Sequence, residues 1–520
     1  MNRKGMLLTE AERDRGEQKR FRSGGSSRKR FAVVFLTVIM LSSFLFGGIS
    51  VHAEPVVDAD VAEPSEGCIF VGLTGTYYQE DQAVLDRMNE IRREACQAGT
   101  VPDPRDPSRM LTESDYKPIR WSADLERIAR VRAYESSLTI SHKRMNDKTI
   151  WTVASNGITS SGEVIAFNRS NGMLRGVEQW YGEKDDWVNG TAGAVTGHYT
   201  MMIDPSRTYV GLGCFCSAMT PYYNCTAGEF SKTAADLDTS MLPVPQGAVM
   251  QKVEVHENNI YNFRIAADNP AMLSGETSGL HLNAEVLWGR GSKELPVLAE
   301  VVYTSDDPSI LEVSEDGTIT AGRIGETTIR AMIGGVEMAA EKMACLTFRD
   351  VLTEYYYYNP VNWAVEKEIT KGTSETTFSP ENPCTRAQAV TFLWRANGSE
   401  KVTDTENPFT DVNEQDYYYD AVLWAIKNKI TNGMTVTSFG PGEKCSRGQI
   451  VTFLWRSEGM HLSSAANAFE DVAESDYYYE PVKWAVENKV TNGTSESAFS
   501  PAAFCTRGQI VTFLYRALAE

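Results

Sequence analysis

The sequence predicts a multidomain protein with three kinds of fold: a mixed α/β domain, a β-sandwich, and an all-α bundle built from three repeats. Its length of 520 residues is that of three or four domains. Along the chain, the spacing of apolar residues changes from mixed helical and strand periods to alternation, and then to a helical period that recurs three times. With 42% hydrophobic and 23% charged residues, the composition is that of a globular protein.

The first 53 residues are predicted to be an export signal. The basic residues Arg28, Lys29 and Arg30 precede an uncharged apolar run over 31–50, and the small-residue tripeptide VHA ends at Ala53. We expect cleavage after Ala53, which leaves no membrane span. An uncleaved anchor is the alternative, because a run of 20 residues is long enough to cross a bilayer. In either case residues 54–68 form a linker and the body of the protein lies outside the cytoplasm.

The body of the protein is strongly acidic. The formal net charge of the whole chain is −19. Residues 1–53 hold 10 Lys and Arg against 4 Asp and Glu, so the remaining residues hold 40 against 65, a net charge of −25. This balance argues against nucleic acid as a partner, since phosphate binding needs a basic surface.

Residues 69–230 mix helical and strand patterns and hold four short polar motifs. Apolar residues at helical spacing predict helices within 81–96 and 125–133. The motifs SHKR, GEVIA, WYGE and GHYT contain, in chain order, His142, Glu163, Glu183 and His198. Successive members lie 21, 20 and 15 residues apart, which matches no short-range metal motif, so the spacing alone does not join them.

These motifs resemble those of the CAP superfamily, which includes the cysteine-rich secretory proteins and the pathogenesis-related proteins of plants. The resemblance implies an α-β-α sandwich with one cleft lined by His142, Glu163, Glu183 and His198. The sequence departs from the family pattern at the rim of that cleft. Val164 stands in place of an Asn, and Asp204-Pro205 stands where a Trp often follows.

Two chemistries are open to such a cleft. Two imidazoles and a carboxylate can hold a divalent cation such as Zn²⁺ with one position left for water, and His142 and His198 would then be the metal ligands. The same groups can act as general acid and base. The sequence has no G-x-S-x-G motif and marks no Ser or Cys as a nucleophile. No residue is therefore assigned as catalytic, and whether the domain is an enzyme stays open.

The nine cysteines are an odd number, so they cannot all pair within one chain. We interpret Cys216 and Cys225 as a disulfide that closes a surface loop. Three others, Cys384, Cys445 and Cys505, occupy one repeated position. The sequence has no CxxC pair with zinc-ribbon spacing.

After a linker over 231–249, residues 250–347 are predicted to form a β-sandwich. Apolar and polar residues alternate there, with turn signals at Asp316-Gly317 and Gly325. The stretch 303–331 resembles bacterial Ig-like group 2 domains. That resemblance implies a spacer module.

The C-terminal third contains three repeats, expected at 348–407, 408–467 and 468–520. Each begins with F-x-D-V and reaches a helix-opening Arg after 38 residues, as from Phe348 to Arg386. The pattern predicts helix, loop, helix, with Gly372, Gly433 and Gly493 as stops of the first helices. The second helices open with capping boxes, in which a hydroxyl caps the helix and a Gln follows three residues later. These boxes are Thr385–Gln388, Ser446–Gln449 and Thr506–Gln509.

Each capping box places an arginine at the first helical position, where the helix dipole disfavours a cation. These residues are Arg386, Arg447 and Arg507. One interpretation is an ion pair with a local acid, such as the Asp of F-x-D-V. The other is an anion receptor, because the free N–H groups of a helix N-terminus and a guanidinium both bind carboxylate or phosphate. The repetition at fixed spacing favours the second interpretation.

The repeats resemble S-layer homology (SLH) domains nearly from end to end. The resemblance implies a pseudo-threefold bundle that binds an anionic secondary cell-wall polymer, or a glycan linked to peptidoglycan, without a covalent bond. The three arginines are the candidate binding residues. Gln replaces the Glu of the family motif TRAE, which keeps the capping box but removes a charge. Tyrosine runs at 355–358, 417–419 and 477–479 could stack on sugar rings or pack in the core.

Two functions compete. The first is a secreted protein of the bacterial cell wall or S-layer surface, held by SLH domains and displaying the CAP cleft to a ligand or partner. The second is an extracellular, peptidase-like hydrolase that uses a metal ion and the His/Glu tetrad. A third function, an S-layer building block, is disfavoured by the mixed architecture.

Overall fold

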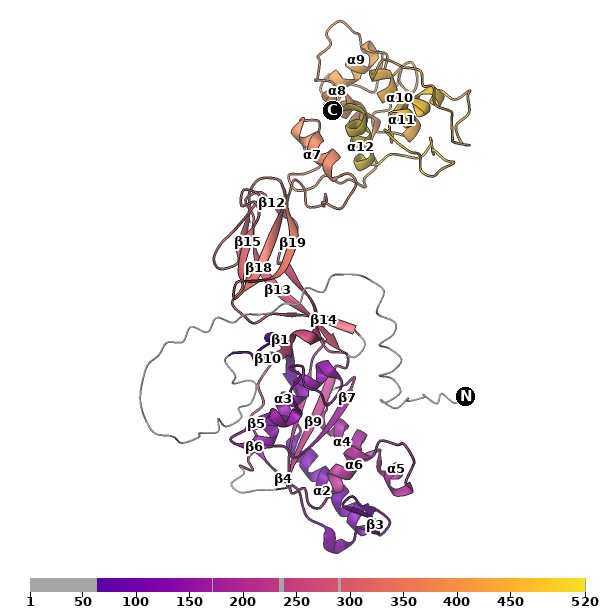
Figure 1. Ribbon diagram of the computed structural model, residues 1–520. Coiled ribbons are helices and arrows are strands. Elements are labelled where there is room, and N and C mark those ends of the chain that lie inside the picture. The colour runs from indigo at the N-terminus through magenta and orange to yellow at the C-terminus, as the bar shows by residue number, and fades with distance from the viewer. Residues whose placement is uncertain (1–62, 171, 233–237, 289–290, 520) are drawn as a thin grey trace, which may run out of the picture. The chain divides into compact units, whose positions relative to one another are not determined.

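The computed structural model describes residues 63–170, 172–232, 238–288 and 291–519 (Figure 1). The predicted export signal at 1–53 lies outside the described residues. The chain divides into two compact units. The first holds the chain up to Ala266 together with 281–303 and 330–341, and the second holds 267–280, 304–329 and 342–520. Within the described ranges, no helix is both long enough and apolar enough to cross a membrane.

The first unit is organised by a mixed sheet with the strand order β10-β1-β8-β9-β7, and short β4 also pairs with β8. Most neighbours in this sheet are antiparallel, and β4 runs parallel to β8. Strand β10 lies at the start of the segment 250–347, which was predicted to form a β-sandwich. It pairs instead with β1 of this sheet. The strands are β1 (Cys68–Tyr77), β4 (Arg120–Trp121), β7 (Gly162–Asn168), β8 (Tyr209–Cys216), β9 (Asn224–Ser231) and β10 (Val249–His256).

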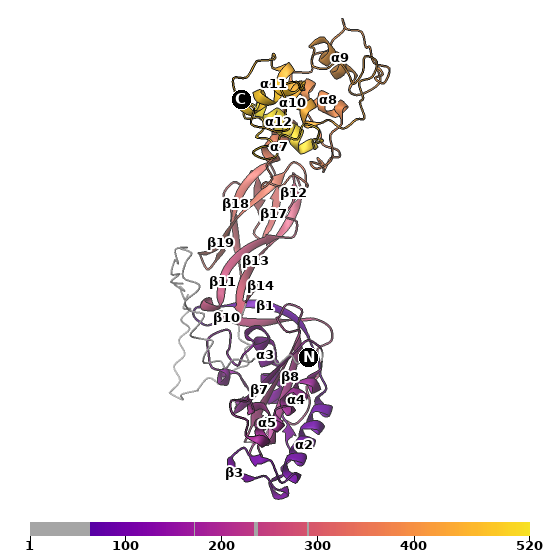
Figure 2. The ribbon, with the colours of Figure 1, turned by 90° about the vertical axis from the view of Figure 1, so that its right-hand side faces the viewer.

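Helices cover both faces of this sheet (Figures 1 and 2). Helix α3 (Ala123–Thr139) packs on the face that presents Phe215 and Ala227. Helices α2 (Asp81–Gln97), α4 (Met173–Tyr181) and α6 (Gly197–Ile203) pack on the opposite face, against residues that include Val164 and Leu212. A short helix, α5 (Lys184–Asn189), connects α4 to α6. Small hairpins add β2 (Pro102–Asp103), β3 (Asp106–Met110), β5 (Ala154–Ser155) and β6 (Ile158–Thr159).

Two glycines of β8 bring α3 close to the sheet. A Cβ atom at Gly211 would lie 2.1 Å from the backbone nitrogen of Glu126, and one at Gly213 would lie 2.5 Å from that of Arg130. Both distances are shorter than a carbon–nitrogen contact allows, so glycine is required at both positions. The close approach fixes α3, which carries the buried residues behind the candidate cleft.

Residues 260–346 form two small sheets. One has the order β11-β13-β17-β16 with β14 paired to β13, and the other has the order β12-β19-β18-β15. A division into two sheets is also what a β-sandwich requires. Their strands are β11 (Ile260–Ala267), β12 (Met272–Leu273), β13 (Thr277–Trp288), β14 (Gly291–Pro296), β15 (Val302–Ser305), β16 (Leu311–Val313), β17 (Thr318–Ala321), β18 (Gly325–Ile333) and β19 (Val336–Leu346).

In the repeats, each unit contributes two helices, and the predicted capping boxes are confirmed. The helices are α7 (Tyr358–Glu366), α8 (Arg386–Ala396), α9 (Tyr419–Lys427), α10 (Arg447–Ser457), α11 (Tyr479–Glu487) and α12 (Arg507–Leu518). The repeats were expected to form an all-α bundle, but they also contain short β-bridges that join one repeat to another. These bridges join Pro383 to Thr506, Thr385 to Lys444, and Ser446 to Phe504.

The three repeated cysteines form a closed ring of backbone hydrogen bonds. The amide of Cys384 donates to the carbonyl of Cys505 (2.9 Å), that of Cys445 to Cys384 (2.8 Å), and that of Cys505 to Cys445 (2.9 Å). All three thiols are buried and free. The ring joins the three units in sequence, so the repeats form one body.

The repeated glycines do not end the first helices. Those helices end at Glu366, Lys427 and Glu487, several residues earlier. At Gly372, with φ of +84°, a Cβ atom would come within 2.6 Å of the Phe348 ring. The glycine is therefore needed for a left-handed turn beneath the phenylalanine of F-x-D-V, and Gly433 and Gly493 take the same position under Phe409 and Phe469.

Candidate functional site

The structure brings the four residues of the predicted tetrad together as two His–Glu pairs. Nδ1 of His142 lies 2.7 Å from Oε1 of Glu163, and Nδ1 of His198 lies 2.5 Å from Oε1 of Glu183. The two imidazole rings are 6.4 Å apart between centroids and nearly parallel, at 20°. Glu163 comes from β7, and the other three come from the ends of helices or from loops beside the sheet.

Behind His198 lies Trp180, whose part in this site the sequence analysis did not consider. Its ring is 6.5 Å from that of His198 and inclined by 19°, so Trp180, His198 and His142 follow one another as three nearly parallel rings. Trp180 is buried, whereas the His142 side chain is 52% exposed. The stack therefore runs from the core to the surface. The W-Y-x-E motif contained this signal, because its tryptophan precedes Glu183 by three positions.

Glu183 has a second role as an acceptor for helix α6. Its Oε2 accepts the backbone N–H groups of His198 (3.0 Å) and Tyr199 (3.1 Å), while its Oε1 contacts the His198 ring. A carboxylate at the N-terminus of a helix satisfies free N–H groups and interacts well with the helix dipole. One side chain therefore positions both the backbone and the imidazole of His198.

Glu163 is held by a buried cluster of charged residues. Nε of Arg132 donates to Glu163 (2.6 Å), and Arg132 also contacts Glu135, which accepts a 2.7 Å hydrogen bond from Arg144. Burial alone would raise the pKa of Glu163, but hydrogen bonds from His142 and Arg132 outweigh it and hold that pKa below its usual value. Glu163 is therefore a carboxylate at neutral pH, oriented for His142.

Glu229 on β9 lies directly opposite Glu163 on the neighbouring strand β7, and no motif in the sequence pointed to it. Its side chain is buried, and burial together with the neighbouring Glu163 raises its pKa well above the usual value. This shift favours the protonated form, so Glu229 can donate a hydrogen bond to Glu163. The register of β7 and β9, which no local motif encodes, creates this pair.

The donor set of the tetrad fits a metal ion only in part. Both imidazoles use Nδ1 toward a carboxylate, as metal-bound histidines commonly do, which leaves each Nε2 as the ligand atom. However, the described residues contain no group of three or more His, Cys, Asp or Glu side chains arranged to hold a metal. A metal ion held between His142 and His198 would therefore need water or substrate to complete its coordination.

The predicted Cys216–Cys225 disulfide is not formed, and all nine cysteines are free. The reason is the register of β8 and β9, in which Cys216 lies opposite Asn224, and Cys225 lies opposite Phe215. Successive strand residues point to opposite faces, so the two thiols lie on different sides of the sheet. Position in the chain suggested proximity, and the alternation of the strand prevents the bond.

The three repeated arginines are buried, and each contacts a different repeat. The exposed fractions of Arg386, Arg447 and Arg507 are 2%, 5% and 4%. Their Nε atoms donate to the carbonyl oxygens of Phe439, Phe499 and Phe378 at 3.0, 2.9 and 2.9 Å, and each guanidinium lies over the ring of that same phenylalanine. The disfavoured alternative, an ion pair with the F-x-D-V aspartate, is not seen: none of the three arginines forms an ion pair within the described repeats.

The aspartates of F-x-D-V instead hold the turns that receive these arginines. Asp411 accepts the N–H groups of Phe439 (2.8 Å) and Gly440 (2.9 Å), and the Ser438 hydroxyl. Asp350 and Asp471 accept the equivalent backbone N–H groups of the turns at 378–379 and 499–500. The acid therefore orients a turn whose phenylalanine carbonyl binds the arginine of another repeat.

Around these arginines are three equivalent sets of polar side chains, which we call the Tyr–hydroxyl–Arg clusters. In each, an exposed tyrosine lies beside the hydroxyl that caps a second helix, and two arginines interact with that tyrosine electrostatically. The first comprises Tyr356, Thr506, Arg447 and Arg516. The second comprises Tyr417, Thr385, Arg507 and Arg395. The third comprises Tyr477, Ser446, Arg386 and Arg456.

Family models match the chain in four places. The cysteine-rich secretory protein family (CAP) matches residues 85–228, and the S-layer homology domain matches 347–390, 408–451 and 468–511. The protein therefore contains one CAP domain and three SLH domains. SLH domains mark proteins of the bacterial cell wall and S-layer surface, and this protein is one of them.

Curated relatives share a limited part of their length with this chain. An S-layer protein of Bacillus anthracis is 24% identical over 194 residues, which is 37% of this chain and 23% of the relative. An endoglucanase of Bacillus sp. (strain KSM-635) is 27% identical over 174 residues, 32% of this chain and 18% of the relative. A cell surface protein of Thermoanaerobacter kivui is 29% identical over 116 residues, 21% of this chain and 15% of the relative. The chain thus spans less than a quarter of each.

Proposed function

We propose that this protein is held non-covalently to an anionic secondary cell-wall polymer by its SLH triplet, and that it displays the CAP cleft for ligand or partner binding. The helices of the three SLH domains act as one pseudo-threefold bundle. The observation that carries the anchoring proposal is the set of three Tyr–hydroxyl–Arg clusters. Each cluster offers cations, hydroxyl groups and an exposed aromatic ring, the groups that recognise a charged sugar.

The positive charges of the clusters support an anionic ligand. None of their six arginines forms an ion pair among the described residues. The Nη2 atoms of Arg386 and Arg507 are buried and have no hydrogen-bond partner in the described part of the chain. A buried cationic donor without an acceptor is costly, and an anionic ligand oxygen would remove that cost.

The tyrosines give each cluster its exposed part. Tyr356, Tyr417 and Tyr477 are 55%, 61% and 59% exposed. Each belongs to a different repeat from the capping hydroxyl that it contacts, and the arginine at the first helical position comes from the remaining repeat. Every cluster thus depends on all three repeats, which is why a single SLH domain would not supply a complete one.

Sedimentation with purified bacterial wall tests the anchoring. The full-length protein should sediment with wall and remain soluble with wall stripped of its secondary polymers. A triple variant with Tyr356, Tyr417 and Tyr477 changed to Ala should bind about tenfold or more weakly, the effect of losing about 1.4 kcal/mol. The matched control changes three exposed tyrosines outside the clusters, Tyr222, Tyr261 and Tyr355. Equal weakening by both triple variants would contradict the assignment.

The arginines need a separate design, because each also links two repeats. Replacing all three with Ala would break those links, so loss of binding could simply report unfolding. Single Lys replacements keep the charge and remove the planar guanidinium, and each removes only one of the three links between repeats. A single Lys variant that is still folded at the assay temperature, as its thermal unfolding shows, yet loses wall binding would support the direct role. One that keeps both would assign the arginines to the fold alone.

A metal-dependent hydrolase is the second candidate function. The observation that favours it is the use of Nδ1 of His142 and His198 toward Glu163 and Glu183, which leaves both Nε2 atoms for a metal or for proton transfer. Calorimetric titration of the full-length protein with Zn²⁺ tests it, with a His142→Ala/His198→Ala double variant and a His281→Ala control. Metal binding that only the double variant loses, together with metal-dependent hydrolysis of a peptide substrate, would establish the enzyme. Absence of both would leave the cleft as a binding site.

A further inference from the structure

The three cysteines of β8 and β9 lie on two different faces of the sheet. Cys214 and Cys216 are two positions apart on one strand, so their side chains point to the same face of the sheet. Both belong to the hydrophobic cluster that includes residues of α2, α4 and α6. Phe215, between them, belongs to the cluster on the α3 side, and Cys225 lies opposite Phe215.

Contacts between the side chains confirm that these two thiols are close neighbours. Cys214 Sγ lies 3.3 Å from Oδ1 of Asn224, and Asn224 is the residue directly opposite Cys216 in the sheet. The neighbouring Cys214 thiol lowers the pKa of Cys216, whereas the Cys216 thiol and burial raise the pKa of Cys214. Cys216 is therefore the better nucleophile of the pair.

We propose that Cys214 and Cys216 form a reversible dithiol–disulfide pair, which a low-molecular-weight disulfide oxidises. The Cys216 thiolate attacks one sulfur of the reagent, forms a mixed disulfide and releases one thiol. Cys214 then loses its proton and attacks the Cys216 sulfur, which forms the Cys214–Cys216 bond and releases the second thiol. Two electrons and two protons pass from the cysteines to the reagent, so one disulfide is exchanged for another.

The geometry of β8 makes this bond labile. Residues two apart on an extended strand have Cα atoms about 6.6 Å apart. Disulfides span Cα distances of about 4.4–6.8 Å, so the strand sets the pair near the upper limit and must shorten locally to close it. Strained disulfides are more easily reduced than structural ones. The pair is thus suited to reversible oxidation and not to a permanent cross-link.

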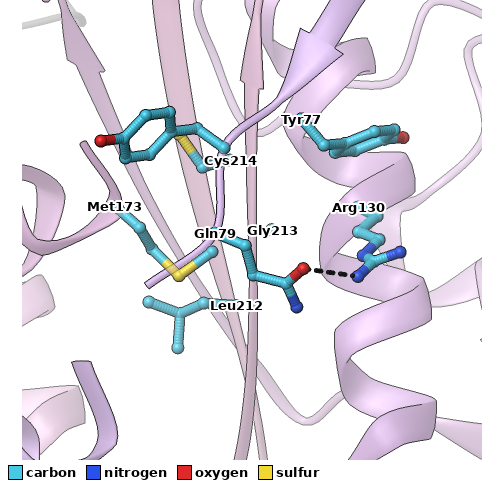
Figure 3. Close-up of a pocket in the computed structure, with 8 residues that line it drawn as sticks. Tyr77, Gln79, Arg130, Met173, Leu212, Gly213 and Cys214 are labelled. Atoms are coloured by element: carbon cyan, nitrogen blue, oxygen red, sulfur yellow. Dashed lines mark hydrogen bonds between the residues drawn. The ribbon is translucent and has the colours of Figure 1, made fainter. Parts of the chain in front are cut away.

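Both thiols are buried, with exposed fractions of 1% and 2%, so a reagent reaches them only when the strand opens locally. Cys214 lines a recess together with Met173, Gln79 and Tyr77 that is too small to hold a water molecule, so its sulfur is closely packed in the reduced protein (Figure 3). Cys216 is the last residue of β8, and the loop after it carries the exposed residues Tyr222 and Tyr223. The end of β8 next to this loop is where such a local opening would first expose a buried thiol.

Mass spectrometry of the full-length protein tests the pair. Trypsin releases one peptide, 208–232, that contains Cys214, Cys216 and Cys225. In a Cys225→Ser variant this peptide holds only the proposed pair, so a loss of two hydrogen atoms after incubation with oxidised glutathione identifies their bond without ambiguity. We expect most of the peptide to be converted, and dithiothreitol to restore both thiols within the folded protein.

Single variants examine the order of steps. Cys214→Ser should accumulate glutathione on Cys216, because the second attack is removed, and Cys216→Ser should accumulate at least tenfold less on Cys214. Circular dichroism confirms that each variant is folded. Two results would overturn the proposal: both thiols staying fully alkylatable in the Cys225→Ser variant, or the wild-type protein linking Cys216 to Cys225.

Discussion

Arg507, the first residue of the last helix, donates a 2.9 Å hydrogen bond from Nε to the carbonyl oxygen of Phe378, 129 residues earlier in the chain. The same bond joins Arg386 to Phe439 and Arg447 to Phe499. Each repeat thus gives an arginine to one neighbour and receives one from the other. The bond from Arg507 back to the first repeat closes the ring.

We predict that Arg507→Lys destabilises a turn distant in sequence. The lysine keeps the charge but cannot place an Nε–H against the Phe378 carbonyl while its head lies over the ring, so a buried acceptor loses its partner. The expected cost is about 1.5–3 kcal/mol. Hydrogen exchange across 376–382 measures it. As the control, Arg323→Lys should change little, because the Arg323 side chain is 63% exposed and pairs with a surface acid.

Asp411 should make the SLH triplet sensitive to acid. Burial raises its pKa, but the N–H groups of Phe439 and Gly440 and the Ser438 hydroxyl outweigh burial and lower the pKa below 3.8. Its contribution to stability is therefore present above pH 3.8 and is lost as the pH falls through the lower folded-state pKa. Asp411→Asn should cost about 2 kcal/mol at pH 7 and much less at pH 2.

Urea unfolding at the two pH values, followed by hydrogen exchange in 438–447, measures the effect of Asp411→Asn. Asp404→Asn is the matched control, since the Asp404 side chain is 70% exposed. An equal cost of the Asp411 substitution at both pH values would show that the carboxylate charge is not what holds the turn.

The two acids of the CAP tetrad should respond differently to the same substitution. The Glu163 side chain is 1% exposed and pairs with buried Arg132, whereas that of Glu183 is 16% exposed and accepts backbone N–H groups. Removing one partner of a buried ion pair costs about 3–5 kcal/mol, so Glu163→Gln should cost about 3 kcal/mol. Glu183→Gln should cost about 1 kcal/mol. Chemical unfolding of the two variants side by side would refute this contrast if their stabilities were equal.

Asp81→Asn should stabilise the protein at alkaline pH. Burial, followed by repulsion from Glu126, raises the pKa of Asp81 to about 7, and its Oδ1 atom is buried without a hydrogen-bond partner. The folded state thus binds a proton more tightly than the unfolded state does, so stability falls as the pH rises from about 4 to about 7. Asparagine removes this penalty, and thermal unfolding should show a gain of about 1 kcal/mol at pH 8 and none at pH 4. A gain of the same size at both pH values would contradict the titration.

The sequence was most informative where the determining interactions are local. The capping boxes at Thr385, Ser446 and Thr506 involve residues three apart, and all form as predicted. The tetrad residues also meet, but the resemblance to a known family, and not their spacing, gave the reason to expect it.

The relationships that the sequence could not provide depend on register and on contacts between repeats. Cys216 and Cys225 lie on opposite faces because β8 and β9 pair in the register that sets Cys216 opposite Asn224 and Cys225 opposite Phe215. Glu229 meets Glu163 for the same reason. Each SLH arginine binds a backbone carbonyl oxygen of another repeat instead of an acid. Every residue has such a carbonyl, so the sequence does not indicate which one the arginine binds.

The closed ring of arginine bonds also limits how such a chain can change in length. Every repeat is both donor and recipient, so deleting one leaves an arginine without an acceptor and a carbonyl without a donor, and inserting one leaves no gap to fill. Because the ring closes only with three repeats, we expect modules of this design to be gained or lost in evolution as complete sets of three.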